Sequence, residues 1–312
     1  CNGNYTLFCF RVEELYLANV TLGNYCSVDL VYPANPALNQ KKRTETVTQA
    51  QLAFQKGEKL CADNCRFVSR LNLVPVCGAK RALYRKGHFE STDDALNGNA
   101  VYVGCDFDFY GNRPIYQATG TGAVFIDCIF RSKIKTMGTE AEQYLTKEGG
   151  QVALIDCRYE TEGNVPVRVG WTKYPLPSLK CYQYGVVQNG KPVTLGGDDS
   201  EETVQLQGKK ALEAYVFEYE EKRYINIENL LGGSKGWNPP GEPSISKKAG
   251  KLRIPTFMQL HTDREKIAFG EETIHVTANV YLFSGEECQE RVDFFLEKSD
   301  MVYAELIPES ER

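Results

Sequence analysis

The chain has 312 residues, of which 42% are hydrophobic and 25% are charged, so it can bury a substantial core in one elongated domain with a smaller second one. Its net charge of −5 gives no general attraction for nucleic acid, and no basic stretch is interleaved with aromatic residues. No apolar run approaches the roughly 20 residues of a membrane-spanning helix. We therefore predict neither a nucleic-acid partner nor a membrane span.

Eleven cysteines are an odd number, so they cannot all form disulfides. Several sit inside apolar segments, among them Cys65, Cys105, Cys128 and Cys157. This placement favours small buried hydrophobic residues over the disulfide framework of a loop-rich domain. The chain begins at Cys1 without a methionine, which suggests a processed or truncated N-terminus.

A short phrase recurs through the first half of the chain: Asn, Asp or Gly, then Cys, then any residue, then an aromatic residue. Four copies and a weaker fifth, with Gly at the Cys position, place that position at 65, 87, 105, 128 and 157, which are 22, 18, 23 and 29 residues apart. An earlier copy spans Val12 to Leu22, with Val20 at the Cys position. Such intervals are typical of one coil of a β-solenoid. Because residues two apart in a strand share a face, we expect each Cys and its aromatic partner to point into the core.

The composition of the sequence changes after the last copy of the phrase. Residues 193–210 are polar and rich in Gly, Asp and Glu, which predicts a loop or an edge strand. Residues 211–231 carry apolar residues at roughly helical spacing and are followed by Gly232 and Gly233, which predicts a helix or an extended tail packed on the solenoid.

A Pro-rich linker at 239–243 precedes a segment that alternates apolar and polar residues over several strands, notably Glu272–Phe283 and Arg291–Leu306. This pattern favours a small β-sandwich. We therefore predict an all-β chain with three parts, a parallel β-helix over 1–192, a tail packed on it over 193–243 and an Ig-like β-sandwich over 244–312.

The stretch from Gln49 to Cys105 carries several motifs in a fixed order: QAQLAFQKGEKLCADNCRF, then Leu-Asn-Leu at 71–73, then RALYRKGHF and ESTDDALNGNA. This order resembles the pectin methylesterases, in which Gln-Ala-x-Ala-Leu and Asn-Cys-x-Phe precede Gln-Asp-Thr-Leu, Arg-x-x-Phe and Gly-Thr-Val-Asp-Phe-Ile-Phe-Gly-Asn-Ala. TGAVFIDCIF at Thr121 and YINIENLLGGSKGWNP at Tyr224 resemble the family's next rung and its closing segment. The resemblance covers roughly residues 5–240 and implies a right-handed parallel β-helix of the pectin lyase-like type.

The resemblance also implies a mechanism. In this family a carboxylate attacks the C6 carbonyl of methylated galacturonate, a second carboxyl protonates the departing methanol, and water cleaves the acyl-enzyme. Carried over by motif, Asp94 is the nucleophile and Gln49 is a donor to the oxyanion. The family's Gly-Arg-Pro-Trp is represented by Arg168 and Trp171, one residue further apart, as the orienting arginine and the aromatic platform for the sugar.

Three departures from the family pattern put this cycle in doubt. The family's second glutamine is Leu71 here, and its proton-donating aspartate is Asn72. An amide cannot protonate the leaving group, so another carboxyl has to do so. Asp93 is an extra carboxylate beside Asp94, but neighbours on a strand face opposite sides, which would keep Asp93 away from the reaction.

Each candidate also has a structural interpretation. Asp94 can be a solvated turn residue, Gln49 an ordinary strand residue, Arg168 a surface charge and Trp171 a core or edge aromatic. Cys61 and Cys65 are four apart on one strand without a second pair at zinc-site spacing. We therefore predict no metal and no cofactor.

Three functions remain open from the sequence. The first is a pectin methylesterase-like carbohydrate esterase, weakly active or with a rearranged acid. The second is a non-catalytic protein that binds pectin or another galacturonate-rich polysaccharide, with the β-sandwich docking it to a surface or a protein partner. The third is a glycosidase or lyase on the same solenoid, which would need two carboxyls across the bond. All three readings imply a secreted, periplasmic or cell-surface protein.

Overall fold

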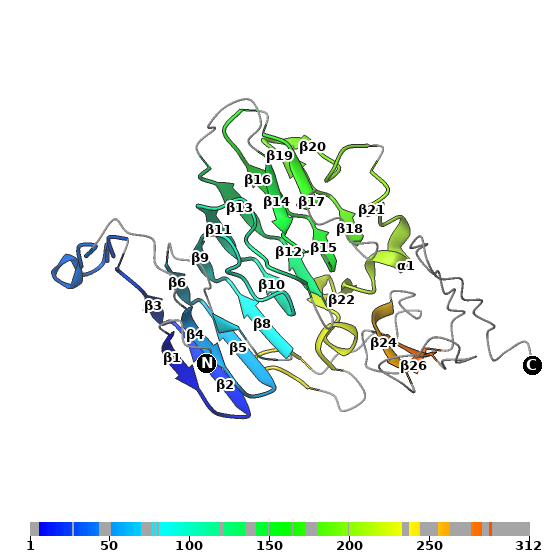
Figure 1. The fold of residues 1–312 in the computed structure, drawn as a ribbon, viewed down its shortest axis with the longest axis horizontal. Helices are drawn as coiled ribbons and strands as arrows, with labels where there is room; N and C mark the ends of the chain where they lie inside the picture. Colours follow the sequence, from blue (N-terminus) through cyan, green and yellow to red (C-terminus); the bar gives the residue numbers. More distant parts are fainter. Residues whose placement is uncertain are drawn as a thin grey trace, which may run out of the picture.

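The computed structural model describes residues 6–26, 28–43, 51–69, 76–77, 79, 81–118, 122–134, 142–148, 150–163, 165–171, 180–198, 200–232, 237–243, 255–262, 276–282 and 287–288. This part of the chain is mostly β-structure, with long parallel sheets running across the molecule (Figure 1). The all-β class predicted from the sequence is confirmed, and the parallel sheets make the fold β-helix-like.

Two sheets of eight described strands dominate the molecule, and the chain alternates between them. The first sheet is parallel throughout and has the order β2 (Glu14–Ala18), β5 (Lys59–Asp63), β8 (Arg81–Arg85), β10 (Ala100–Val103), β12 (Ala123–Ile126), β15 (Gln151–Ile155), β18 (Lys180–Tyr184) and β21 (Thr203–Gln205). The second has the order β3 (Thr21–Gly23), β6 (Arg66–Val68), β9 (His88–Ser91), β11 (Asp106–Phe109), β13 (Ile129–Ser132), β16 (Arg158–Glu160), β19 (Val187–Gln188) and β20 (Lys191–Pro192), of which β20 alone is antiparallel to its neighbour. Each coil thus adds one strand to each sheet.

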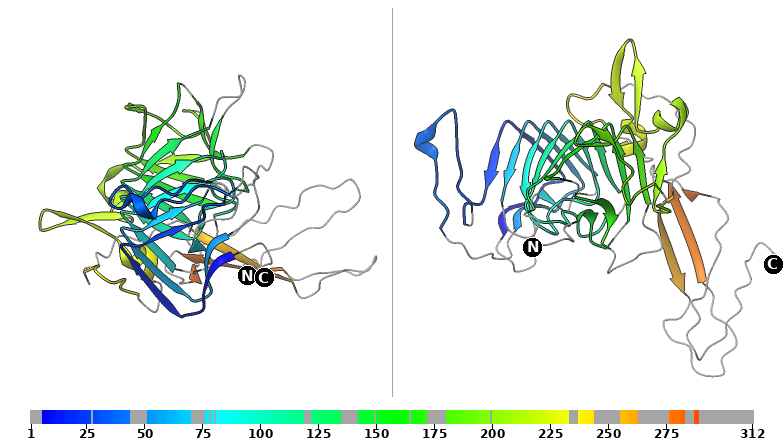
Figure 2. Two further views of the ribbon diagram at one scale, coloured as in Figure 1. Left: turned by 90° about the vertical axis from the view of Figure 1, so that its left-hand side faces the viewer. Right: turned by 90° about the horizontal axis from the view of Figure 1, so that it is seen from above.

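Shorter parallel pairings form a third side of the coils. At the N-terminal end they join β1 (Thr6–Phe10), β4 (Gln51–Gln55) and β7 (Val76–Cys77), and later they join β14 (Gln143–Thr146) to β17 (Val167–Gly170). Between these groups Ile115 forms a parallel bridge to Thr146. Viewed from above, the successive coils lie side by side along the molecule (Figure 2).

The residue before each Cys position turns the chain from the first sheet into the second. Its φ is positive in every described copy: 47° at Asn64, 58° at Gly104, 54° at Asp127 and 52° at Asp156. Asn, Asp and Gly adopt this left-handed conformation more readily than other residues. The corner therefore explains why Asn, Asp or Gly recurs at the first position of the sequence phrase.

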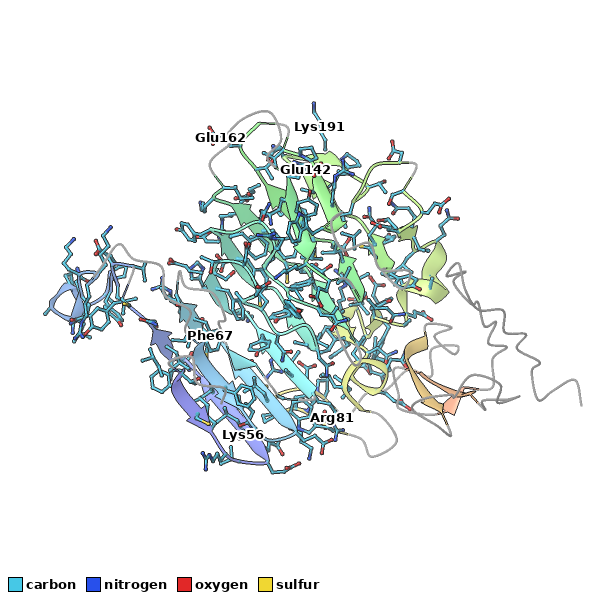
Figure 3. All side chains as sticks on the ribbon, viewed as in Figure 1. Lys56, Phe67, Arg81, Glu142, Glu162 and Lys191 are labelled. Atoms are coloured by element: carbon cyan, nitrogen blue, oxygen red, sulfur yellow. The ribbon has the colours of Figure 1, made fainter. Side chains whose placement is uncertain are left out.

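The aromatic residues of the phrase form one continuous stack inside the coils. Phe67, Phe89, Phe107, Phe130 and Tyr159 are paired in register along the second sheet and are 0–2% exposed. Their successive ring centroids are 5.1, 4.9, 5.3 and 4.7 Å apart. Side chains fill the space between the sheets around this stack (Figure 3, where Phe67 is labelled). The predicted inward face is confirmed.

The cysteines of the phrase are buried beside the aromatic stack. Cys65, Cys105, Cys128 and Cys157 are free thiols with at most 1% exposure. The thiols of Cys105, Cys128 and Cys157 donate to backbone carbonyls of the neighbouring coils. The prediction that these cysteines are small buried core residues is confirmed.

The described residues 208–232, together with Trp237, cover the outer face of the first sheet. They contain a short helix α1 (Gly208–Leu212), a hairpin of β22 (Val216–Tyr219) and β23 (Lys222–Ile225), and a π-helical turn η2 (Glu228–Gly232), and the hairpin projects from the coils in Figure 2. Their apolar side chains pack against outward-facing residues of the sheet, which include Cys61, Leu83, Val101, Val124 and Ile155.

Of the two structures predicted for 211–231, a helix or an extended tail packed on the solenoid, the helix is replaced for the most part by a hairpin, which packs on the first sheet. The segments 216–219 and 222–225 are rich in aromatic and β-branched residues, which favour strands. Glu220 and Glu221, with φ of 47° and 61°, form the turn between them. The spacing of the apolar residues, which predicted a helix, instead marks the residues that pack on the sheet.

Two further elements complete the described chain. A 3-10 turn η1 (Pro36–Leu38) lies in the loop after β3, which packs Val28 and Leu30 against Val68. Beyond residue 243 the described strands are β24 (Pro255–Thr262), β25 (Val276–Leu282) and β26 (Glu287–Cys288), which pair antiparallel. In the described part of the chain, no helix combines the length and apolar composition required to cross a membrane.

Candidate functional site

Asp93 and Asp94 lie in a turn directly after β9, on the third side of the coils. Asp94 has a φ of 55°, and its backbone N–H donates to the Arg113 carbonyl at 2.9 Å. Because these residues are in a turn, the strand alternation expected to separate them does not apply. Arg113 on the next coil binds Asp93 directly and acts electrostatically on Asp94, so the two carboxyls share one neighbouring cation.

Asp93 is held by two hydrogen bonds from Arg113. The backbone N–H of Arg113 donates to Oδ1 at 2.8 Å, and Nη2 donates to Oδ2 at 2.7 Å. Charge-assisted bonds of this length fix the orientation of a carboxylate. Gly111 makes the arrangement possible, because a Cβ there would lie 2.6 Å from the Asp93 backbone nitrogen and closer still to Oδ1.

Asp94 has a different environment. Its Oδ2 lies 3.5 Å from Lys147 Nζ, while its Oδ1 is buried and has no hydrogen-bond partner in the described structure. Burial and the adjacent Asp93 charge raise the pKa of Asp94, although Lys147 and Arg113 act in the opposite direction. The two neighbouring carboxyls are therefore electrostatically unlike.

Aromatic rings lie against both cations of the site. The Arg113 guanidinium carbon is 4.1 Å from the centroid of the Trp171 ring, and Lys147 Nζ is 5.0 Å from the centroid of the Tyr116 ring. Contacts of this kind hold a cation over a ring face. Trp171, expected as an aromatic platform, is thus brought to the aspartate pair through Arg113.

Backbone hydrogen bonds between consecutive coils position these residues. The Lys147 N–H donates to the Ile115 carbonyl at 2.8 Å, and the Trp171 N–H donates to the Thr146 carbonyl at 3.1 Å. Residues 93–94, 113–116, 147 and 171 therefore meet although they are far apart in the sequence. We call Asp93, Asp94, Arg113, Lys147 and Trp171 the aspartate-pair site.

Arg168 lies on β17 and engages another acid. Its Nε donates to Glu142 Oε1 at 2.6 Å, and Glu142 also accepts from the Tyr144 hydroxyl (Glu142 is labelled in Figure 3). Arg168 lines a cavity of about 280 Å³ together with residues 165–167 and 193–197. In the described structure Arg168 thus contacts Glu142, whereas the arginine that contacts Asp93 is Arg113.

The other three residues expected from the resemblance are Gln49, Leu71 and Asn72. All three lie outside the described residues. The aspartate-pair site is consequently described without them.

Arg113, Lys147 and Tyr116 were not singled out from the sequence. The coil period could have indicated Arg113, because position 113 lies one period of 18 to 23 residues beyond Asp93. Lys147 lies one coil further, after a coil lengthened to 29 residues, so the repeat does not predict its alignment with Asp94.

One cluster outside this site has ligands of the kind that bind metals. The ligand atoms of His88, Glu90 and Asp108 lie within 4.8 Å of one another on the outer face of the second sheet. Burial opposes protonation of His88, but hydrogen bonds to Asp106 and Glu90 outweigh it and raise its pKa to about 9. His88 hydrogen-bonds Asp106 at 2.9 Å and lies 3.6 Å from Glu90, so in the described structure these side chains form a network of ion pairs.

A cavity of about 520 Å³ lies between the tail and the corners at Asp156 and Tyr184. Its cation Arg223 already bridges Asp127 at 3.0 Å and Asp156 at 2.5 Å. This bridge fastens the hairpin to two corners of the coils, so we assign the cavity a structural role.

Comparison with known proteins finds no matching family model, no matching curated protein and no matching solved structure. The resemblance to pectin methylesterases therefore stays a prediction from motifs. The function has to be argued from the aspartate-pair site itself.

Proposed function

We propose that this protein is a pectin methylesterase-like carboxylic ester hydrolase that removes methyl esters from galacturonate polymers. The observation that carries the proposal is the pair of adjacent carboxyls with unlike environments: Asp93 accepts two hydrogen bonds from Arg113, whereas Asp94 lies beside Lys147 with its Oδ1 buried and without a hydrogen-bond partner in the described structure. Ester hydrolysis through an acyl-enzyme needs one carboxylate that attacks and one carboxyl that exchanges protons. Two titratable groups with separated environments meet this requirement.

The cations and rings of the site suit an acidic sugar polymer. Arg113 and Lys147 attract carboxylates, and Trp171 and Tyr116 offer aromatic surface for sugar rings. The chain as a whole is acidic, so this attraction has to be local. The aromatic rings are the stronger support for a polysaccharide substrate, because each cation already pairs with an aspartate of the site.

The proposal includes a finer fold assignment. We take the coils to be a right-handed parallel β-helix of the pectin lyase-like type, supported by one strand per sheet in each coil and by the inward aromatic stack. The antiparallel strands β24, β25 and β26 support a small Ig-like β-sandwich at the C-terminal end. A protein of this kind acts on cell-wall material, which implies a secreted, periplasmic or cell-surface location.

A second candidate is a pectin-binding protein without catalytic activity. It is favoured by Asn72 in place of the family's acid and by the cation facing each aspartate of the pair. In this reading the site holds the polymer, and the C-terminal β-sandwich contacts a surface or a protein partner.

The test is methanol release from highly methylated pectin, measured for the wild-type chain and for Asp94→Ala. Activity that the substitution abolishes supports the esterase. Asp198→Asn, at an exposed position in a turn, is the control and should keep wild-type activity. Pectin binding without methanol release by the wild type would instead support the second candidate, and new reducing ends or unsaturated sugars would indicate a glycosidase or a lyase.

A further inference from the structure

We infer that Asp93 is the nucleophile of the aspartate-pair site and that Asp94, at the family's nucleophile position, is its proton donor. The inference rests on the proposed esterase function and assigns the two roles within it. It follows from the hydrogen bonds and burial of the two carboxyls.

Asp93 has the features of an oriented nucleophile. Both its oxygens accept hydrogen bonds from Arg113, at 2.8 and 2.7 Å, and its side chain is 23% exposed. Each carboxylate oxygen keeps a second lone pair, so an oxygen held in this way can still attack a carbonyl. Gly111 leaves the space that this orientation needs.

Asp94 has the features of a proton donor. Its Oδ1 is buried without a hydrogen-bond partner in the described structure, an arrangement that disfavours a carboxylate and tolerates a carboxylic acid. Its contact with Lys147 is an ion pair at 3.5 Å, longer than the roughly 2.8 Å of a charge-assisted hydrogen bond. Burial raises the pKa of Asp94, which keeps a proton available nearer to neutral pH than an ordinary aspartate would.

The reaction balances with these two groups and water. An Asp93 oxygen forms a bond to the ester carbonyl carbon, the bond from that carbon to the methoxy oxygen breaks, and the departing oxygen takes the Asp94 proton to become methanol. The Asp94 carboxylate formed in this step is stabilised by Lys147. It then takes a proton from water while the water oxygen attacks the acyl carbon, which releases the uronic acid and restores the Asp93 carboxylate.

This assignment removes the need for a carboxyl at position 72. In the family arrangement, with Asp94 as the nucleophile, Asn72→Asp would restore the missing acid and raise activity. With Asp93 and Asp94 as the pair, the acid is already present, and the reaction does not depend on a carboxyl at position 72.

The experiment compares Asp93→Asn and Asp94→Asn on two esters of galacturonate oligomers, a methyl ester and a nitrophenyl ester. Nitrophenolate leaves without protonation, so its release does not need the acid. We expect Asp93→Asn to release neither alcohol. Asp94→Asn should lose methanol release by about 10²- to 10⁴-fold. It should still release one equivalent of nitrophenol and then stall, because the acyl-enzyme lacks its base.

Mass spectrometry of the stalled Asp94→Asn protein should place the acyl group on Asp93. An acyl group on Asp94 in Asp93→Asn, or a nitrophenol burst from Asp93→Asn but not from Asp94→Asn, would overturn the inference while leaving the esterase intact. A wild-type protein inactive on both esters would overturn the proposed function itself. Thermal unfolding of each variant, with Asp198→Asn as the matched control, distinguishes loss of chemistry from loss of fold.

Discussion

Arg113 binds Asp93 through both its backbone N–H and its guanidinium, at 2.8 and 2.7 Å. The same guanidinium lies against the face of the Trp171 ring. Three coils are thereby joined by one side chain, since Asp93, Arg113 and Trp171 come from different turns of the chain. The orientation of Asp93 should consequently depend on the residues that position Arg113 as well as on Arg113 itself.

Gly111→Ala should misplace Asp93. A Cβ at this position would lie 2.6 Å from the Asp93 backbone nitrogen, so the turn has to shift. We expect methanol release to fall at least about tenfold, with a loss of about 1–3 kcal/mol in the free energy of unfolding. Gly163→Ala is the control, because Gly163 has a φ of 61° but no atom within 4 Å of its Cβ position. It should lower stability and spare activity, and equal loss of activity in both variants would contradict the prediction.

Arg113→Lys should separate the charge of this residue from its geometry. Lysine keeps the positive charge but cannot make the same fork of hydrogen bonds or stack flat on a ring. We expect reduced activity and a changed fluorescence emission of Trp171, read against Trp237, which is buried and donates to Glu14 at 2.9 Å. Arg158→Lys, at an exposed position, should change neither. Unchanged emission in Arg113→Lys would show that the ring contact does not persist in solution.

The sequence was informative about the coils because every coil repeats the same physical requirements. A residue tolerant of positive φ turns the corner, a small Cys follows, and an aromatic residue stacks on the one before it. Asp127-Cys128 followed by Phe130 meets all three in four residues. A requirement repeated at a regular interval can be recognised in one sequence.

The sequence was less informative about the site because its residues lie in the parts of the coils that do not repeat. Asp93 and Asp94 lie in a turn and share Arg113 as a neighbouring cation, which strand alternation could not predict. Lys147 reaches Asp94 across coils of unequal length. The hairpin at 216–225 was missed because packing on the sheet gave its apolar residues a helix-like spacing.

The cysteines should differ sharply in their reactivity toward iodoacetamide in the native protein. Cys9 is exposed, whereas Cys128 is buried and its pKa is raised, chiefly by burial. We expect peptides containing Cys9 to be alkylated within minutes and peptides containing Cys128 to be alkylated only after unfolding in guanidinium. Equal rates of labelling would be incompatible with the inward face of the coils.

His88→Gln should lower stability in a pH-dependent way. The folded-state pKa of His88 is raised to about 9, above its ordinary value of 6.5. The stabilisation from protonated His88 is therefore complete below the unfolded-state pKa and is lost as the pH rises through about 9. Charged groups around it include Asp106, Asp108, Glu90, Arg66 and Arg131. We expect a loss of about 1–2 kcal/mol at pH 6 and little at pH 10, measured by urea unfolding. A loss independent of pH would contradict this account.

Asp94→Asn should raise stability, whereas His88→Gln lowers it, and the gain should grow as the pH rises. The pKa of Asp94 is raised in the folded protein, mainly by burial, so the folded state binds its proton more tightly than the unfolded state does. Wild-type stability should accordingly decrease as the pH rises from the unfolded value of 3.8 through the higher folded-state pKa, and the cost remains above it. An uncharged asparagine has no such cost, so Asp94→Asn should gain stability relative to wild type between pH 4 and pH 8. Asp198→Asn, at an exposed site, controls for the change in net charge. Urea unfolding at both pH values measures the difference, and a loss of stability in Asp94→Asn at pH 8 would show that Lys147 and Arg113 hold Asp94 as a carboxylate, which would remove it as the proton donor.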